Sequence, residues 1–197
     1  MSRLTWDDLL IREITPEQFE RWLVPWTGVV VGRVAPAFMS KFGFWFLRRP
    51  EGHVEMLDVF TGGVERVAES YELFMRDVNE QWWQERYLLS ELVFQLHQAG
   101  KISGPGQCYA LAPPPALGGP NPTNGQQVDP RFVMVMDIPV WQSLCAQFFR
   151  AVAACPQDSR PRIGVSSALA ARTGSKYSRR DAILPPAARR NSTYSWR

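Results

Sequence analysis

Apolar residues recur along the chain at an interval that changes several times, and each change predicts a new element. Between Thr5 and Thr27 they return every three or four positions, as on one face of a helix. Within this stretch the motif TPEQ at 15–18 combines a capping threonine, a proline in the first turn and a glutamine three residues after the cap. We therefore expect helix over 5–27, then a short strand at 29–31 and a loop around Pro36.

From Gly43 to Ala68 the pattern changes to short runs rich in aromatic and β-branched residues. The runs FWFLRR, HVEMLDVF and VERVA are separated by the breaks PEG (50–52) and TGG (61–63). Glycine-rich breaks this short are typical of hairpin turns, because glycine adopts the positive φ that such turns need. The sequence therefore predicts a three-stranded antiparallel meander.

Helical spacing returns after residue 68. Ser70 is placed to cap a helix whose apolar residues recur from Tyr71 to Val78. A longer helix is expected from about Glu80 to Gln98, with leucines four residues apart on one face. Gly100 would end this helix, because glycine is the residue most often found just beyond a helix C-terminus.

Two further strands and a last helix complete the prediction. The runs QCYALA and RFVMVMDI predict strands on either side of a proline- and glycine-rich corner, and the residues 139–153 have helical spacing. The order of elements predicts an α+β fold: a mostly antiparallel sheet, made of the three-stranded meander plus two further strands, with helices packed on one side.

The charge of the chain divides at about residue 155. Residues 1–155 hold 13 Lys+Arg and 17 Asp+Glu, a balance of −4, whereas residues 156–197 hold 9 and 2, a balance of +7. We expect 1–155 to be a single α+β domain. Residues 156–197 have no sustained period, which favours a disordered basic tail. A translated frameshift is an equally good explanation of their composition.

Neither a membrane segment nor a secretion signal is predicted. No apolar run reaches the roughly 18 residues that span a bilayer. The N-terminal stretch carries Asp7, Asp8 and Glu13 among its apolar residues, unlike the core of a signal peptide. The three cysteines are odd in number and lack CxxC spacing, which gives no disulfide framework and no zinc site. The expected location is the cytoplasm.

Candidate catalytic and metal-binding groups are few. The two histidines, His53 and His97, have no cysteine or acid at ligand spacing, and we expect both to be structural or solvent-facing. The nucleophile elbow, zinc-protease, phosphate-loop and dinucleotide motifs are not found. We therefore predict no catalytic site, no metal and no cofactor, although an enzyme of an unrecognised type is not excluded.

Carboxylates gather in the stretch that follows the meander. A solvated helix face is the commoner explanation of such a stretch, and tryptophans beside it are most often core residues. The functional alternative is an acidic surface that docks a basic partner, with one tryptophan as an exposed anchor. The residues assigned to such a surface are Glu65, Glu69, Glu72, Asp77 and Trp83.

The corner between the last two strands also has two interpretations. Pro113 to Pro115 cannot belong to a central strand, because proline has no amide to donate. Gly118 and Gly119 allow backbone conformations that other residues avoid, or the close approach of another chain. A rigid connection that sets the angle between two strands is the simpler of these explanations.

Two segments of the chain carry a resemblance to known families. The segment GQCYALAPPPALGGPNPTNGQQVDPRFVMVMDIPVWQSLCAQ resembles the C-terminal module of bacterial type VI secretion immunity proteins that protect against DNase toxins. The residues that match are Tyr109, Pro115, Leu117, Gly118, Gly119, Val128, Asp137 and Gln147. The upstream hairpin and helix are similar to the SUKH class of immunity proteins, at Asp58, Thr61, Gly62, Val64, Ser70 and Phe74.

The resemblance spans about residues 40–150 and implies a role rather than a binding site, because the matching residues are mostly structural. It implies a non-enzymatic cytoplasmic immunity protein that neutralises a cognate toxin, such as a DNase, by covering its active surface. The acidic balance of residues 1–155 agrees with a basic partner. A general interaction or scaffold module is the alternative. Nucleic acid is expected as a partner only through the basic tail.

Overall fold

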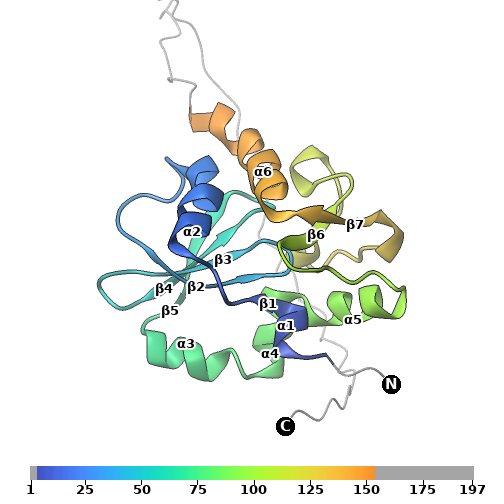
Figure 1. The fold of residues 1–197 in the computed structure, drawn as a ribbon, viewed down its shortest axis with the longest axis horizontal. Coiled ribbons are helices and arrows are strands. Elements are labelled where there is room, and N and C mark those ends of the chain that lie inside the picture. Colours follow the sequence, from blue (N-terminus) through green and yellow to red (C-terminus); the bar gives the residue numbers. More distant parts are fainter. Residues whose placement is uncertain (1–3, 154–197) are drawn as a thin grey trace, which may run out of the picture. The chain divides into compact units, whose positions relative to one another are not determined.

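The computed structural model describes residues 4–153, which fold as an α+β domain (Figure 1). The α+β class predicted from the sequence is confirmed: helices accompany a five-stranded sheet and a separate two-stranded sheet, both antiparallel. The predicted basic tail at 156–197, with both of its explanations, lies outside the described residues.

The helical stretch expected over 5–27 is divided into short elements. The capping motif at Thr15 is confirmed: the Gln18 amide donates to the Thr15 hydroxyl over 3.3 Å, and the Thr15 amide donates to the Gln18 side chain over 2.9 Å. Leu10 and Ile11 are not helical, because they pair with a strand. The elements are α1 (Trp6–Leu9), β1 (Leu10–Ile11), α2 (Pro16–Leu23) and a 3₁₀ turn, η1 (Val24–Trp26).

The five-stranded sheet has the strand order β1-β2-β3-β4-β5, which is also the order along the chain. The predicted meander is confirmed as its last three strands, in which Trp45 lies opposite Leu57 and Leu57 lies opposite Val64. The strands that follow β1 are β2 (Ala35–Ser40), β3 (Trp45–Arg48), β4 (Val54–Asp58) and β5 (Gly63–Ala68).

The strand β2 stands where the sequence predicted a loop around Pro36. Proline is tolerated here because β1 pairs only with Met39 and Ser40, so that Pro36 lies where β2 has a strand on one side alone. The strand expected at 29–31 is not formed, and the bridge between Thr27 and Val30 is isolated. The prediction at 29–31 rested on three successive valines, which alone do not supply a pairing partner.

Helices cover both faces of the sheet, so the expectation of helices on one side is wrong. The ring of Trp45 contacts Phe19 of α2, with the centroids 5.5 Å apart. The next residue, Phe46, points to the opposite face and contacts Phe74 of α3 (Tyr71–Asp77) at 5.7 Å. Because successive residues of β3 are both fully buried, neither face is left to solvent. Figure 1 shows α2 and α3 on opposite sides of the sheet.

The helix predicted from Glu80 to Gln98 is broken near its middle. The helix before it is as predicted, since the Ser70 hydroxyl accepts from the Leu73 amide over 3.2 Å. The break lies at Leu89, whose φ of 54° is left-handed. Three elements replace the single helix: α4 (Gln81–Trp83), a π-helical turn, η2 (Gln84–Leu88), and α5 (Ser90–Gln98). Gly100, with φ 73°, follows the end of α5 as predicted.

The two further strands pair with each other and not with the large sheet. The corner between them is a rigid connection: Gly118 has φ 86°, and a side-chain carbon on Gly119 would lie 2.0 Å from the carbonyl oxygen of Pro113. This close approach is therefore made by the chain to itself. The elements are β6 (Gln107–Leu111), three 3₁₀ turns (Pro115–Leu117, Pro122–Asn124 and Pro130–Phe132), β7 (Val133–Asp137) and α6 (Ile138–Ala153).

The outer edge of β7 has no strand beside it in the described part of the chain. Lys101 lies along this edge, where its ammonium group donates to the carbonyl oxygens of Pro130 over 2.8 Å and Val133 over 2.6 Å. Phe132 and Met134 are exposed nearby. At Val133 the lysine thus occupies an acceptor that a further strand would otherwise use.

Candidate functional site

A hollow of about 290 Å³ opens beside the β4–β5 hairpin. It brings together the two segments that carry the family resemblance: Asp58 and Thr61 come from the hairpin, and Thr123 comes from the 3₁₀ turn after the double glycine. The turn η2 adds Tyr87 to its wall. We call this site the Asp58 hollow, and the other residues that line it are Met56, Gly63, Val64, Glu65, Arg86 and Asn124.

The carboxyl group of Asp58 is the most buried acid of this hollow. Its residue is 8% exposed, and one carboxylate oxygen accepts from the Phe60 amide over 2.8 Å. Burial raises the pKa of Asp58, because a charged carboxylate is poorly solvated there. The Phe60 amide and the side chains of Thr61 and Thr123 act in the opposite direction and lower the pKa. The net direction is upward.

The rim of the Asp58 hollow carries two charges of opposite sign around an aromatic ring. Glu65 is exposed and forms no salt bridge within the described residues. The guanidinium carbon of Arg86 lies 5.1 Å from the centroid of the Tyr87 ring. Burial raises the pKa of the Tyr87 hydroxyl, Arg86 lowers it, and Glu65 raises it. Both charged groups therefore shift the pKa of a residue that lines the same hollow.

The four carboxylates assigned to an acidic surface are in different situations. Glu65 lines the Asp58 hollow, and Glu72 is exposed in the first turn of α3. Glu69 pairs with Arg66 over 3.0 Å, and Asp77 pairs with Arg76 over 2.8 Å. The structure places Glu65 on β5 and the others in or just before α3, so they follow one another along one connection. Exposed pairs such as these contribute little to stability, because water screens them.

Trp83 is not a surface residue, and its assignment as an interface anchor is wrong. It is 1% exposed, and its ring packs against Phe46 at 5.2 Å and Phe74 at 5.5 Å. The exposed tryptophan is its neighbour Trp82, at 56%. Successive residues of a helix point about 100° apart, so two adjacent tryptophans can differ in burial, as these two do. The sequence does not indicate which one is buried.

Exposed apolar side chains accompany the acids on α3 and α4. Leu73 and Met75 are exposed on α3, and Trp82 is exposed on α4. Figure 1 shows these two short helices in succession on the side of the sheet away from α2. We call Glu72, Leu73, Met75, Asp77 and Trp82 together the α3–α4 surface.

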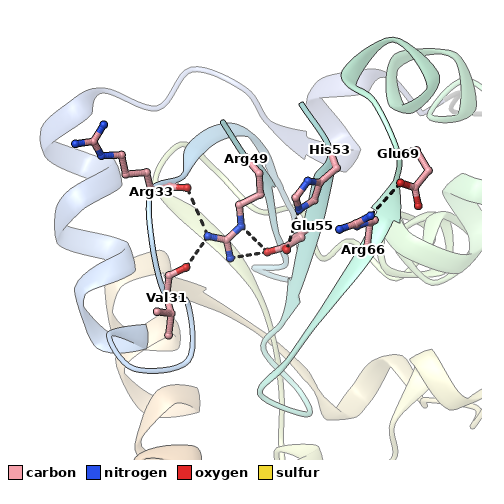
Figure 2. Close-up of polar contacts among 7 residues, drawn as sticks. All are labelled: Val31, Arg33, Arg49, His53, Glu55, Arg66 and Glu69. Carbon is pink, nitrogen blue, oxygen red and sulfur yellow. Dashed lines mark hydrogen bonds and ion pairs between the residues drawn. The ribbon is translucent and has the colours of Figure 1, made fainter. Parts of the chain in front are cut away.

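A second hollow, of about 530 Å³, lies at the end of the β3–β4 hairpin. Figure 2 shows the polar contacts of side chains that line it. At its centre Arg49 binds Glu55 through Nε over 2.7 Å and Nη2 over 2.6 Å. Its Nη1 donates to the carbonyl oxygens of Val31 and Arg33. His53 Nε2 lies 3.1 Å from the other oxygen of Glu55. The Arg49 guanidinium group therefore makes its hydrogen bonds within the fold, where it links the loop at 31–33 to the hairpin.

The other candidate groups from the sequence are structural in the part that the structure describes. Tyr109 is a buried residue of β6, and its hydroxyl donates to the Lys101 carbonyl oxygen over 3.2 Å. Gly62 lies against the ring of Phe149, where a side chain would collide. Cys108 is buried, which raises its thiol pKa to about 12. Over residues 4–153 no three ligating side chains stand close enough for a metal ion.

Comparisons with known proteins add no assignment. No protein-family model matches this chain, and no curated protein does. Over the same described residues, no helix combines the length and apolar character needed to cross a membrane. The resemblance to immunity proteins stays a prediction from the sequence.

Proposed function

We propose that this domain is a non-enzymatic binding protein that neutralises a basic protein, as an immunity protein does with its cognate bacterial toxin. One observation carries the proposal: Trp82 is 56% exposed on the α3–α4 surface, beside a run of carboxylates. Large aromatic side chains held in solvent next to a charged rim are the usual anchors of protein interfaces.

The composition of the surface favours a protein as the occupant. Leu73, Met75 and Trp82 are exposed within ten residues of one another in the chain, and Trp82 is the largest of these exposed apolar side chains. Tryptophan and methionine are enriched in the centre of interfaces, where they leave water on binding. The Glu72 and Asp77 carboxylates supply the polar surroundings of such a centre.

The charge of the same segment favours a basic partner. Residues 65–86 contain six carboxylates and three arginines. A toxin that cleaves nucleic acid needs a basic cleft for phosphate groups, and an acidic surface that covers the cleft is attracted to it at long range. The exposed pair Arg66–Glu69 can exchange its partner at little cost, because it is weak in water, and in the pair Arg76–Asp77 the arginine is exposed.

The experiment is a protection assay. The full chain is produced in cells together with the toxin-like protein encoded beside its gene, and survival is counted. Protection by the wild type and its loss in Trp82→Ala support the proposal. Phe132→Ala is the matched control, because Phe132 is also an aromatic residue, is 53% exposed and lies on another part of the fold.

Two results would contradict the proposal. One is a wild-type chain that does not protect. The other is a Trp82→Ala variant that protects as well as Phe132→Ala does. A chain that binds the neighbouring protein without blocking its toxicity is instead an interaction or scaffold module.

A further inference from the structure

We propose that the Asp58 hollow receives one cationic side chain, arginine or lysine, of the basic partner. This inference rests on the proposed function and names one chemical group of the partner that this domain would bind. The hollow is about 290 Å³, at the lower limit of the volumes that hold small molecules and cofactors. A single long side chain is the occupant that such a volume suits.

The wall of the hollow offers a carboxylate that lacks a cation. Asp58 is 8% exposed, and within the described residues its carboxyl group forms no salt bridge. Its neighbours are the Phe60 amide and two threonine side chains. Burying a charged carboxylate costs free energy unless a cation accompanies it, and Arg86, the cation among the residues that line the hollow, forms no salt bridge with Asp58 in the described structure. A partner's ammonium or guanidinium group would supply it.

At the mouth of the hollow, a cationic side chain of the domain itself already lies on an aromatic ring. Arg86 already places its guanidinium over the Tyr87 ring, 5.1 Å from the centroid. Planar cations stack on such faces because the ring carries negative charge above its plane. Arg86 is exposed and in no salt bridge with a described residue, so it can move aside when a second cation enters.

Glu65 is the second carboxylate of the proposed site. It is exposed on β5, lines the same hollow and has no salt bridge among the described residues. A long cationic side chain that enters past Glu65 reaches Asp58 with its charged end, while Met56 and Val64 contact its methylene groups. The two carboxylates thus have separate roles: Glu65 attracts the cation at the mouth, and Asp58 binds it inside.

The test measures binding of a fluorescent hexa-arginine peptide, and of hexa-lysine, to the full chain at low salt. The variants are Asp58→Asn and Glu65→Gln. The control is Glu20→Gln, which removes one exposed carboxylate from α2, away from the hollow. We expect affinity to fall at least about tenfold in Asp58→Asn, because the inner charge is desolvated, and less in Glu65→Gln. Glu20→Gln should bind as the wild type does.

Equal affinity of Asp58→Asn, Glu20→Gln and the wild type would overturn the inference. So would equal losses in all three variants, which would mean attraction by net charge alone. If Asp58→Asn fails to fold, which a thermal melt shows, Glu65→Gln against Glu20→Gln decides the question, since both positions are exposed.

The protection assay separates this inference from the proposed function. Loss of protection in Trp82→Ala, with full protection in Asp58→Asn and Glu65→Gln, would retain the function and reject the hollow. A wild type that does not protect, but whose peptide binding falls in Asp58→Asn and not in Glu20→Gln, would reject the function and retain a cation site.

Discussion

Glu55 is the residue at which two basic side chains meet on one carboxylate. Arg49 binds one of its oxygens twice, and His53 lies against the other (Figure 2). Burial acts to raise the pKa of Glu55, but Arg49 and His53 together lower it, and the net direction is downward. A carboxylate whose pKa is lower in the folded state stabilises the fold only while it is charged.

This gives a prediction for stability against pH. The contribution of Glu55 is complete above its ordinary pKa of 4.5 and is lost as the pH falls through its lower value in the fold. In thermal melts from pH 7 to pH 3, the wild type should therefore lose more stability than Glu55→Gln does, by a few degrees. Glu51→Gln, at an exposed position of the same hairpin, is the control and should follow the wild type. Parallel curves for the wild type and Glu55→Gln would contradict the prediction.

Residue patterns predicted some of the candidate site and missed the rest for physical reasons. Glu65 was assigned from the sequence as a surface acid, and the structure places it at the mouth of a hollow. The hollow was not predictable, because Asp58 and Thr123 are distant in the chain and only tertiary packing joins them. Trp83 was assigned in place of Trp82, because adjacent tryptophans give no indication of which one faces the core.

At the scale of elements, one buried side chain of α6, Gln142, joins this helix to the sheet through a network of hydrogen bonds. The Gln142 carbonyl oxygen accepts from the Trp26 indole over 2.6 Å and from the Trp45 indole over 3.2 Å. Its amide nitrogen donates to the carbonyl oxygen of Gly43 over 2.8 Å. One glutamine of α6 therefore satisfies polar groups from η1, β3 and the turn before β3, all away from water.

Replacing Gln142 with leucine should destabilise the domain strongly. Leucine has a similar size but leaves two indole N–H groups and a carbonyl oxygen without partners, which costs about 2–4 kcal/mol. Urea unfolding measures the change. Gln147→Leu is the matched control on the same helix, because Gln147 is exposed, and it should change the free energy of unfolding by less than about 0.5 kcal/mol. Equal effects of the two substitutions would show that the buried network adds nothing.

The elements predicted from the sequence are those whose signal is local. Hairpins with glycine turns and the Ser70 cap depend on residues next to one another, and the structure has them. The strand β2 was missed because Pro36 argues against a strand unless its neighbours are known. The break at Leu89 was missed because a left-handed leucine has no sequence signature, and its packing within the core sets it. The presence of helices on both faces of the sheet was missed because a local pattern does not indicate which face a helix covers.

At the scale of the whole molecule, charge should govern how fast the proposed partner is found. Residues 1–155 hold 13 Lys+Arg and 17 Asp+Glu. An acidic domain approaches a basic one faster than a neutral one, and salt screens this attraction over about 10 Å at 0.1 M.

Stopped-flow mixing with the neutralised toxin should therefore show two separate effects. Raising the salt from roughly 50 to 300 mM should lower the association rate about tenfold and leave the dissociation rate nearly constant. Trp82→Ala should do the reverse, because a buried anchor acts after the encounter. Phe132→Ala, at an equally exposed aromatic residue, should change neither rate. A salt-independent association rate would argue against electrostatic steering.

Lys101 has a consequence for handling the protein at high concentration. Its ammonium group binds the Val133 carbonyl oxygen on the open edge of β7 and the Pro130 carbonyl oxygen in the turn before that strand, beside the exposed side chains of Phe132 and Met134. Acylation of this amine would free the Val133 carbonyl oxygen, so that the edge of β7 could pair with a strand of another molecule. Acylation at Lys101 should accordingly raise the self-association of the protein at high concentration, which light scattering measures.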